Sequence, residues 1–227
     1  MVPLLADNIG RSIDSFARPL GNGGVCLDVG CGEQPLRASL EALGFAYSSL
    51  DLAQNQSGTV QHIGAIDRSL PTSLANAAFD FIVCTEVLEH VADWTQAFTN
   101  LSALLKPGGR LLITCPHIWV PHEEPADFFR PTSWALAHYA KASGLGTLSI
   151  ERLGDGFDVL GTVLAAVRVT APKNQPWMWM LAGPLSLLRK LALAVLFMKP
   201  MRKILRLPTP LYLSTIAVFE KTASRSA

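Results

Sequence analysis

The stretch VCLDVGCG at residues 25–32 decides the fold. Its apolar first half predicts a buried strand, and Asp28, Gly30 and Gly32 stand at the carboxyl end of that strand, just before a helical pattern. Ligands of open α/β sheets bind outside the carboxyl ends of the strands, and glycines there let a ligand approach the main chain closely. A dinucleotide turn, G-x-G-x-x-G, is the rival interpretation, but its third glycine would fall at Pro35. The stretch therefore predicts a nucleotide-type binding turn.

Apolar runs alternate with helical patterns through the first 155 residues, which is typical of βαβ units and a parallel sheet. The expected strands lie at 24–29, 45–50, 59–63, 79–84, 110–115, 147–152 and 212–221. The expected helices lie at about 34–43, 94–105 and 132–143, and a long segment of mainly helical character precedes the last strand. We therefore expect an α/β fold with a helical insertion before its last strand.

Composition narrows the class of protein. A chain of 227 residues with 49% hydrophobic residues is long enough for one domain plus an elaboration. The net charge of +1 does not indicate a nucleic-acid binder. The four cysteines have no paired spacing, so neither a metal site nor a redox site is expected. The N-terminus lacks the basic and apolar regions of a secretion signal, so a cytoplasmic location is expected.

Further motifs follow in a fixed order. Asp51 ends the second strand, 19 residues past Gly32, and Asp67 follows the third strand. The runs FDFIVCTEVLEHV at 79–91 and LLKPGGRLLI at 104–113 come next. Together with LDVGCG at 27–32, these motifs resemble those of class I S-adenosylmethionine-dependent methyltransferases, in particular the methyltransferase type 11-like group. The resemblance covers about residues 25–151 and returns at the final strand.

The resemblance implies a Rossmann-like fold, with a mostly parallel seven-stranded sheet, an antiparallel last strand and helices on both faces. It implies S-adenosylmethionine as the cofactor. Carried over residue by residue, it predicts the cofactor-binding residues Asp28, Gly30, Cys31, Gly32, Asp51, Leu52, Asp67, Thr85 and Glu86. Many members of the group have a glycine or another small residue where this chain has Gln34-Pro35. Proline suits the first turn of a helix, so we expect the helix to start at a shifted position here. Asp80 is interpreted as a strand-start residue, and His90 as either a site residue or a partner of loop backbone.

The loop after the fifth strand, CPHIWVPHEEPADFFRPTSW at 115–134, collects histidines, acids, an arginine and aromatic residues. Loops at that end of the sheet often carry function. Methylation of a hydroxyl needs a base, and histidine is the usual candidate near neutral pH. His122 is the first candidate for the general base and His117 the second. The candidates for binding the acceptor are Trp119, Asp127 and Arg130. The alternative is that His122, Asp127 and Arg130 only pin the loop.

The insertion before the last strand is basic and apolar. Residues 159–219 hold eight Lys/Arg and no acidic residue, whereas residues 1–158 hold nine Lys/Arg and 17 Asp/Glu. Within the Trp-, Met- and Leu-rich segment 176–207, Pro184 and Arg189-Lys190 interrupt the best window for a membrane span. Leucines share one face of the helical wheel, with Ser186, Arg189 and Lys190 opposite. Two interpretations stay open: a cap or oligomer contact, and a basic amphipathic helix in a membrane interface.

These observations predict three parts, which are a cofactor-binding core at 1–158, a basic apolar helical insertion at 159–210, and the final strand with its tail at 211–227. The predicted function is S-adenosylmethionine-dependent methyl transfer, at oxygen, to a small-molecule or glycan- or lipid-linked acceptor, with no nucleic acid as partner. If the insertion touches lipid, we expect peripheral contact with the inner membrane face through 176–207. The alternatives are a non-catalytic cofactor-binding protein of the same fold and a nicotinamide-dependent oxidoreductase.

Overall fold

The computed structural model describes residues 3–74, 76, 78–167, 170, 172, 174, 176–198, 202, 204–205, 207 and 210–222. The chain divides into two compact units. The first comprises Met1–His117, Pro121–Arg152 and Ser214–Ala227, and the second comprises Ile118–Val120 and Leu153–Leu213.

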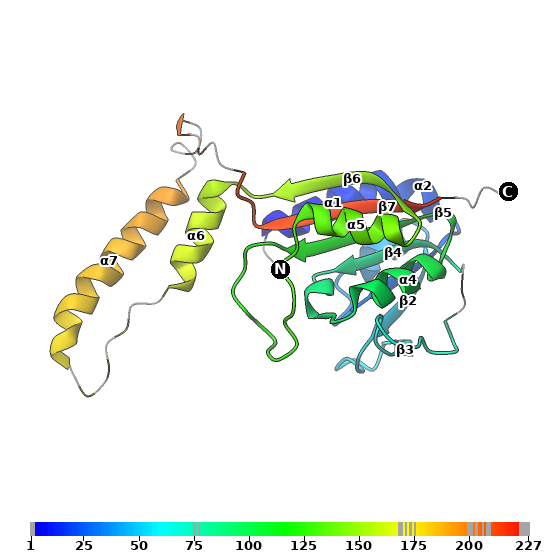
Figure 1. Ribbon diagram of the computed structural model, residues 1–227, viewed down its shortest axis with the longest axis horizontal. Helices are drawn as coiled ribbons and strands as arrows, with labels where there is room; N and C mark the ends of the chain where they lie inside the picture. The colour runs from blue at the N-terminus through cyan, green and yellow to red at the C-terminus, as the bar shows by residue number, and fades with distance from the viewer. Residues whose placement is uncertain are drawn as a thin grey trace. The chain divides into compact units, whose positions relative to one another are not determined.

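The first unit is built on one seven-stranded sheet (Figure 1). Its strands are β1 (Val25–Val29), β2 (Ala46–Asp51), β3 (His62–Ile63), β4 (Phe79–Thr85), β5 (Leu105–Pro116), β6 (Leu145–Leu153) and β7 (Ser214–Lys221). Their order across the sheet is β3-β2-β1-β4-β5-β7-β6. The pairs from β3 to β5 are parallel, and β7 is antiparallel to β5. The predicted seven-stranded, mostly parallel sheet with an antiparallel last strand is confirmed.

Helices cover both faces of this sheet. They are α1 (Pro3–Ser12), continued by a π-helical turn (Ile13–Ala17) and α2 (Arg18–Gly21), then α3 (Arg37–Ala42), α4 (Trp94–Leu104) and α5 (Ser133–Ala142). In Figure 1, α4 and α5 lie over one face, while α1 and α2 lie over the other. Central strands are therefore buried on both sides: Leu27 of β1 and Ile82 of β4 are fully buried. Such strands have continuous apolar sequences, as VCLDV and FDFIVCT do.

Three elements begin three or more residues from the expected position: α3, β5 and also β3, which begins at His62 rather than at residue 59. The helix expected from about Gln34 begins at Arg37, because Gln34 has a φ of 58°, which a right-handed helix cannot contain. The Gln34 side chain turns inward, and its Nε2 donates to the Thr59 carbonyl at 3.0 Å. The strand expected from Arg110 begins earlier, at Leu105, so LKPGG forms part of β5 beside an irregularity of register in β4.

The second unit contains α6 (Gly156–Ala166), a 3₁₀ turn (Pro176–Met178) and α7 (Trp179–Leu196). Asp155 caps α6, because its side chain accepts the N–H groups of Phe157 and Asp158, and Asp158 accepts the Asp155 N–H in return. Among the described residues, no helix is both long enough and apolar enough to cross a membrane. Lys199, Lys203 and Arg206 of the predicted basic segment lie outside the described residues.

Candidate functional site

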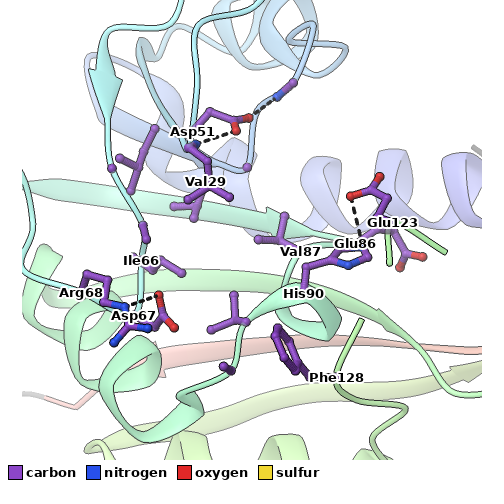
Figure 2. A pocket seen from close by; sticks show the side chains of 18 residues that line it. Val29, Asp51, Ile66, Asp67, Arg68, Glu86, Val87, His90, Glu123 and Phe128 are labelled. Carbon is purple, nitrogen blue, oxygen red and sulfur yellow. Dashed lines mark hydrogen bonds and ion pairs between the residues drawn. The ribbon is translucent and has the colours of Figure 1, made fainter. Parts of the chain in front are cut away.

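A cavity of about 480 Å³ opens in the first unit at the carboxyl ends of β1, β2 and β4 (Figure 2). The order of strands along the chain reverses between β1 and β4, and such a switch point is the usual ligand crevice of an open α/β sheet. Most of the predicted cofactor-binding residues line the cavity, namely Gly30, Gly32, Asp51, Leu52, Asp67 and Glu86. The other three, Asp28, Cys31 and Thr85, do not line it.

Asp51 is held at the end of β2 by two backbone N–H groups. Gly32 N donates to Oδ2 at 2.8 Å, and Leu52 N donates to Oδ1 at 2.7 Å (Figure 2). An ionised carboxylate has about four lone-pair sites, so both oxygens keep the capacity to accept further hydrogen bonds. Asp51 can therefore accept a pair of neighbouring hydroxyl groups at the cavity wall.

The turn after β1 brings backbone to the cavity. Gly30 has a φ of 67° and Gly32 a φ of 50°, and Gly30 N donates to the Leu50 carbonyl at 2.8 Å. A Cβ atom added at Gly30 would lie 2.2 Å from Cγ2 of Val87, which is another lining residue. Glycine is therefore required at position 30 both by backbone conformation and by space.

Asp67 gives the cavity a second carboxylate, away from Asp51 in Figure 2. Its Oδ2 accepts the Asp93 N–H at 3.4 Å, and its Oδ1 lies 4.0 Å from Nε of Arg68. The apolar side chains of Val29 and Ile66 line the same cavity. An apolar cavity with a few placed polar groups is the usual form of a small-molecule site.

Asp28 is buried, with 2% of its surface exposed, and Tyr47 donates its hydroxyl to Oδ2 at 2.8 Å. Burial raises the pKa of Asp28 to about 6, the Tyr47 hydrogen bond lowers it, and the charge of Asp51 raises it. Asp80 has a structural role, because its Oδ2 accepts hydrogen bonds from Val25 N at 2.8 Å and from Lys106 Nζ at 2.7 Å.

The cavity wall across from Asp51 is made by Glu86, His90, Glu123 and Phe128 (Figure 2). Glu86 follows β4 directly, has a φ of 54°, and donates its N–H to both the carbonyl and the hydroxyl of Thr114. Burial raises the pKa of the Glu86 carboxyl. Phe128 is held by its N–H, which donates to the Glu89 carbonyl at 2.8 Å. The loop after β5 thus contributes directly to the cavity.

A hydrogen bond to backbone defines which ring nitrogen of His90 carries the proton. Its Nδ1 lies 2.7 Å from the Ala126 carbonyl, which can only accept, so Nδ1 carries a proton and the neutral ring has its lone pair on Nε2. That Nε2 atom lies 3.9 Å from Oε1 of Glu89 and 3.8 Å from Oε2 of Glu123. The backbone contact that the sequence suggested for His90 is present, and the ring lines the cavity as well.

The two histidines predicted as bases do not line the cavity. Nδ1 of His122 lies 3.3 Å from Nη2 of Arg130, and a guanidinium only donates, so in the neutral ring the proton is on Nε2. The His122 ring stands edge-on to His90, with centroids 4.7 Å apart. Nδ1 of His117 lies 3.0 Å from the Pro131 carbonyl.

Asp127 and Arg130 form a two-pronged ion pair, with Nη1–Oδ1 and Nη2–Oδ2 distances of 2.6 and 2.7 Å. Asp127 also accepts the His122 N–H at 2.9 Å. The Arg130 hydrogen bonds hold the pKa of Asp127 far below its ordinary value. This pair fixes the loop that carries His122, and neither residue lines the cavity. Trp119, the third predicted acceptor contact, belongs to the second unit.

Sequence reasoning missed Glu89, which is fully buried on the 3₁₀ turn Leu88–His90. Burial, followed by the charge of Glu86, raises its pKa to about 8. Donor atoms of Glu89, His90 and His122 lie within 4.8 Å of one another, and these residue types can bind a metal ion. An ion would have to displace the Glu89 proton and the Arg130 contact at His122. The expectation of no metal site stays a prediction.

Comparison with known proteins agrees with this geometry. A family model described as a methyltransferase domain matches residues 5–148. Ubiquinone biosynthesis O-methyltransferases from Xanthomonas euvesicatoria and Caulobacter vibrioides are 35% identical over 107 residues and 33% identical over 110 residues. These matches cover 40% and 44% of this chain, and 43% and 44% of the relatives. The chain thus spans less than half the length of these two curated relatives.

Solved structures show the same fold. A SAM-dependent methyltransferase from Archaeoglobus fulgidus aligns with a TM-score of 0.59 over 95% of this chain and 94% of its own, at 11% identity. Phosphoethanolamine N-methyltransferase 2 from Haemonchus contortus, solved with S-adenosyl-L-methionine, aligns with a TM-score of 0.58 over 95% and 53%, at 15% identity.

The family model covers more than half of the chain, and the mixed sheet, the glycine turn and the strand-end carboxylates agree with it. The chain therefore belongs to the methyltransferase domain family, within the class I methyltransferases that use S-adenosylmethionine.

Proposed function

We propose that the protein binds S-adenosylmethionine in the cavity and transfers its methyl group to a hydroxyl oxygen of an acceptor that enters beside His90. The observation that carries the proposal is the placement of Asp51 and Asp67 on one side of the cavity and of Glu86 and His90 on the other. The names of the Xanthomonas and Caulobacter relatives, which are O-methyltransferases, support oxygen as the accepting atom.

The chain's own residues fit such a cofactor. Asp51 offers two carboxylate oxygens, already oriented by backbone N–H groups, to the hydroxyls of a ribose. Asp67 offers an acceptor to an adenine amino group, and the turn at Gly30–Gly32 leaves room for the amino-acid end. When bound, S-adenosylmethionine supplies a methyl group on a positively charged sulfur, so little chemical activation is required of the protein.

We assign the general base to His90 in preference to His122. The Ala126 carbonyl fixes the His90 proton on Nδ1, which leaves Nε2 free to take the acceptor's proton. Oε2 of Glu123 lies 3.8 Å from Nε2, and this carboxylate would stabilise the charged ring that forms. His122, whose Nδ1 faces Arg130, then positions the loop and the edge of the His90 ring.

Two measurements test the proposal. The first is a calorimetric titration with S-adenosylmethionine and, separately, with NAD. The second follows transfer of a labelled methyl group to a catechol, a methyl hexoside and a primary alkyl amine. We expect binding of S-adenosylmethionine alone and labelling of a hydroxyl compound. Binding of NAD alone would overturn the assignment of the cofactor, and labelling of the amine alone would overturn oxygen as the acceptor atom.

The role of His90 is tested by His90→Gln, His122→Ala and, as a control on an exposed histidine of α5, His138→Ala. His90→Gln should keep cofactor affinity and lower kcat by about 10²–10⁴-fold, because the acceptor hydroxyl loses the group that takes its proton. His122→Ala should lower kcat by about tenfold or less, and His138→Ala should change nothing. If His122→Ala shows the large loss while His90→Gln stays active, His122 is the base, as the sequence predicted.

A further inference from the structure

Polar side chains of α7 contact other parts of the second unit. Arg189 lies half-buried, and its Nη1 donates to the Leu164 and Ala165 carbonyls near the end of α6, at 3.3 and 3.1 Å. A helix leaves its last carbonyls without partners, so Arg189 satisfies backbone groups that need a donor. Ser186, one turn before Arg189, is also half-buried. The part of the polar side that carries Ser186 and Arg189 is therefore turned away from solvent, whereas Lys190 is exposed.

The apolar side of α7 is exposed instead. We call the following five residues, which share one face of α7, the outer apolar surface: Met180, Leu187, Leu188, Leu191 and Val195. Met180 is 79% exposed and Leu188 is 63% exposed. Trp177 and Trp179, at the start of the helix, are exposed as well. Leu160 and Val163 of α6 and its C-cap residue Val167 are exposed as well and follow one another at helical spacing. Contiguous apolar surface of this kind marks an interaction site.

The second unit carries a net positive charge, which favours an anionic partner. Leu153–Leu213 holds eight Lys/Arg and two acidic residues, Asp155 and Asp158. Both acids are engaged, because they cap α6 and Arg202 pairs with Asp158 and lies 3.6 Å from Asp155. Lys190 is exposed beside the outer apolar surface. A symmetric contact between two second units would set two segments against each other that each hold six more basic than acidic residues, whereas an anionic surface would neutralise them.

We propose that α7, with its flanking residues, docks the protein on the interface of an anionic lipid bilayer. The outer apolar surface would enter the boundary between headgroups and acyl chains, with Trp177 and Trp179 at headgroup level and Lys190 against lipid phosphates. The helix lies on the bilayer rather than across it, because the charged pair Arg189-Lys190 stands in its middle. This proposal is independent of the proposed methyl transfer.

The test is co-sedimentation of the full-length chain with vesicles of phosphatidylcholine alone and of phosphatidylcholine with 30% phosphatidylglycerol, at low and at high salt. We expect pelleting with the anionic vesicles, weakened by salt, and little pelleting with the neutral ones. The tryptophan emission should shift to the blue on binding, and the shift should be lost in the double variant Trp177→Phe/Trp179→Phe.

Matched pairs of variants test whether vesicle binding depends on the outer apolar surface or on any exposed apolar side chain. Leu187→Ser/Leu191→Ser should weaken vesicle affinity by about tenfold or more, since both side chains leave the lipid. Leu148→Ser/Trp134→Ser, which removes exposed apolar side chains of β6 and α5, should leave the affinity unchanged. Lys190→Glu should weaken binding by about fivefold or more, and Lys141→Glu on α5 should have no effect. Circular dichroism and cofactor affinity report whether each variant is folded.

Several outcomes would overturn the proposal. Wild-type protein that stays in solution with anionic vesicles is one, and retention of vesicle binding by folded Leu187→Ser/Leu191→Ser is another. Light scattering of the lipid-free protein shows whether the chain associates with itself. If the wild type is a dimer, the double leucine variant is a monomer, and neither binds vesicles, the outer apolar surface is an interface between copies of this chain.

Discussion

At the scale of single residues, Gly30 meets two constraints at once, a positive φ and a neighbour too close for any side chain. We expect Gly30→Ala to lower the free energy of unfolding by about 2–4 kcal/mol and to weaken cofactor binding at least about tenfold. Gly108→Ala is the control, because Gly108 has a φ of 78° but open space around it. It should cost about 1 kcal/mol and leave cofactor binding unchanged. Denaturant unfolding and calorimetric titration of both variants decide the matter.

Asp28 makes stability depend on pH in a defined direction. Burial raises its pKa to about 6 in the folded chain, above the ordinary value of about 4 for an exposed aspartate, so its contribution to stability is complete below about pH 4 and is lost as the pH rises through 6. An Asp28→Asn variant should therefore gain stability relative to the wild type between pH 4 and pH 7, by about 1–3 kcal/mol. The measurement is the midpoint of denaturant unfolding against pH. Asp7→Asn, at an exposed carboxylate of α1, serves as the control. Parallel pH curves for Asp28→Asn and the wild type would contradict this account.

The sequence located Asp51 and Asp67 because each follows a recognisable strand, and parallel strands bring their carboxyl ends to one edge. It could not locate the proton of His90, which depends on the carbonyl of Ala126, 36 residues further along the chain. It also could not show that Glu89 is fully buried, since a short 3₁₀ turn has no sequence period that distinguishes its inner face.

At the scale of helices and strands, long periodic or apolar segments were predictable and their ends were not. β4 and α4 lie where the apolar run and the helical spacing placed them. The start of α3 was misplaced because Gln34 takes a left-handed conformation to bury its amide against Thr59, a tertiary contact that local pattern does not reveal. Helical spacing placed Arg189 on the polar face of α7. It could not show that the Arg189 side chain donates hydrogen bonds to carbonyls of α6.

At the scale of the whole molecule, the cavity lies within the first unit, so cofactor binding should stabilise that unit selectively. Hydrogen exchange followed by mass spectrometry, with and without S-adenosylmethionine, tests this. Exchange should slow in peptides covering residues 25–32, 46–52 and 86–91. It should stay unchanged in α6 and α7, which serve as the internal control. Equal slowing at residues 156–166 would show that the second unit takes part in binding.

The strand order has a consequence for how the chain is made. β7 lies between β5 and β6, yet it follows the whole second unit along the chain. While a ribosome is still making residues 154–213, the nascent sheet has a gap where its last strand must insert. The apolar α7 therefore leaves the ribosome before the domain that precedes it can close. A premature stop anywhere in that stretch would remove the strand that joins β5 to β6, and not merely a surface appendage.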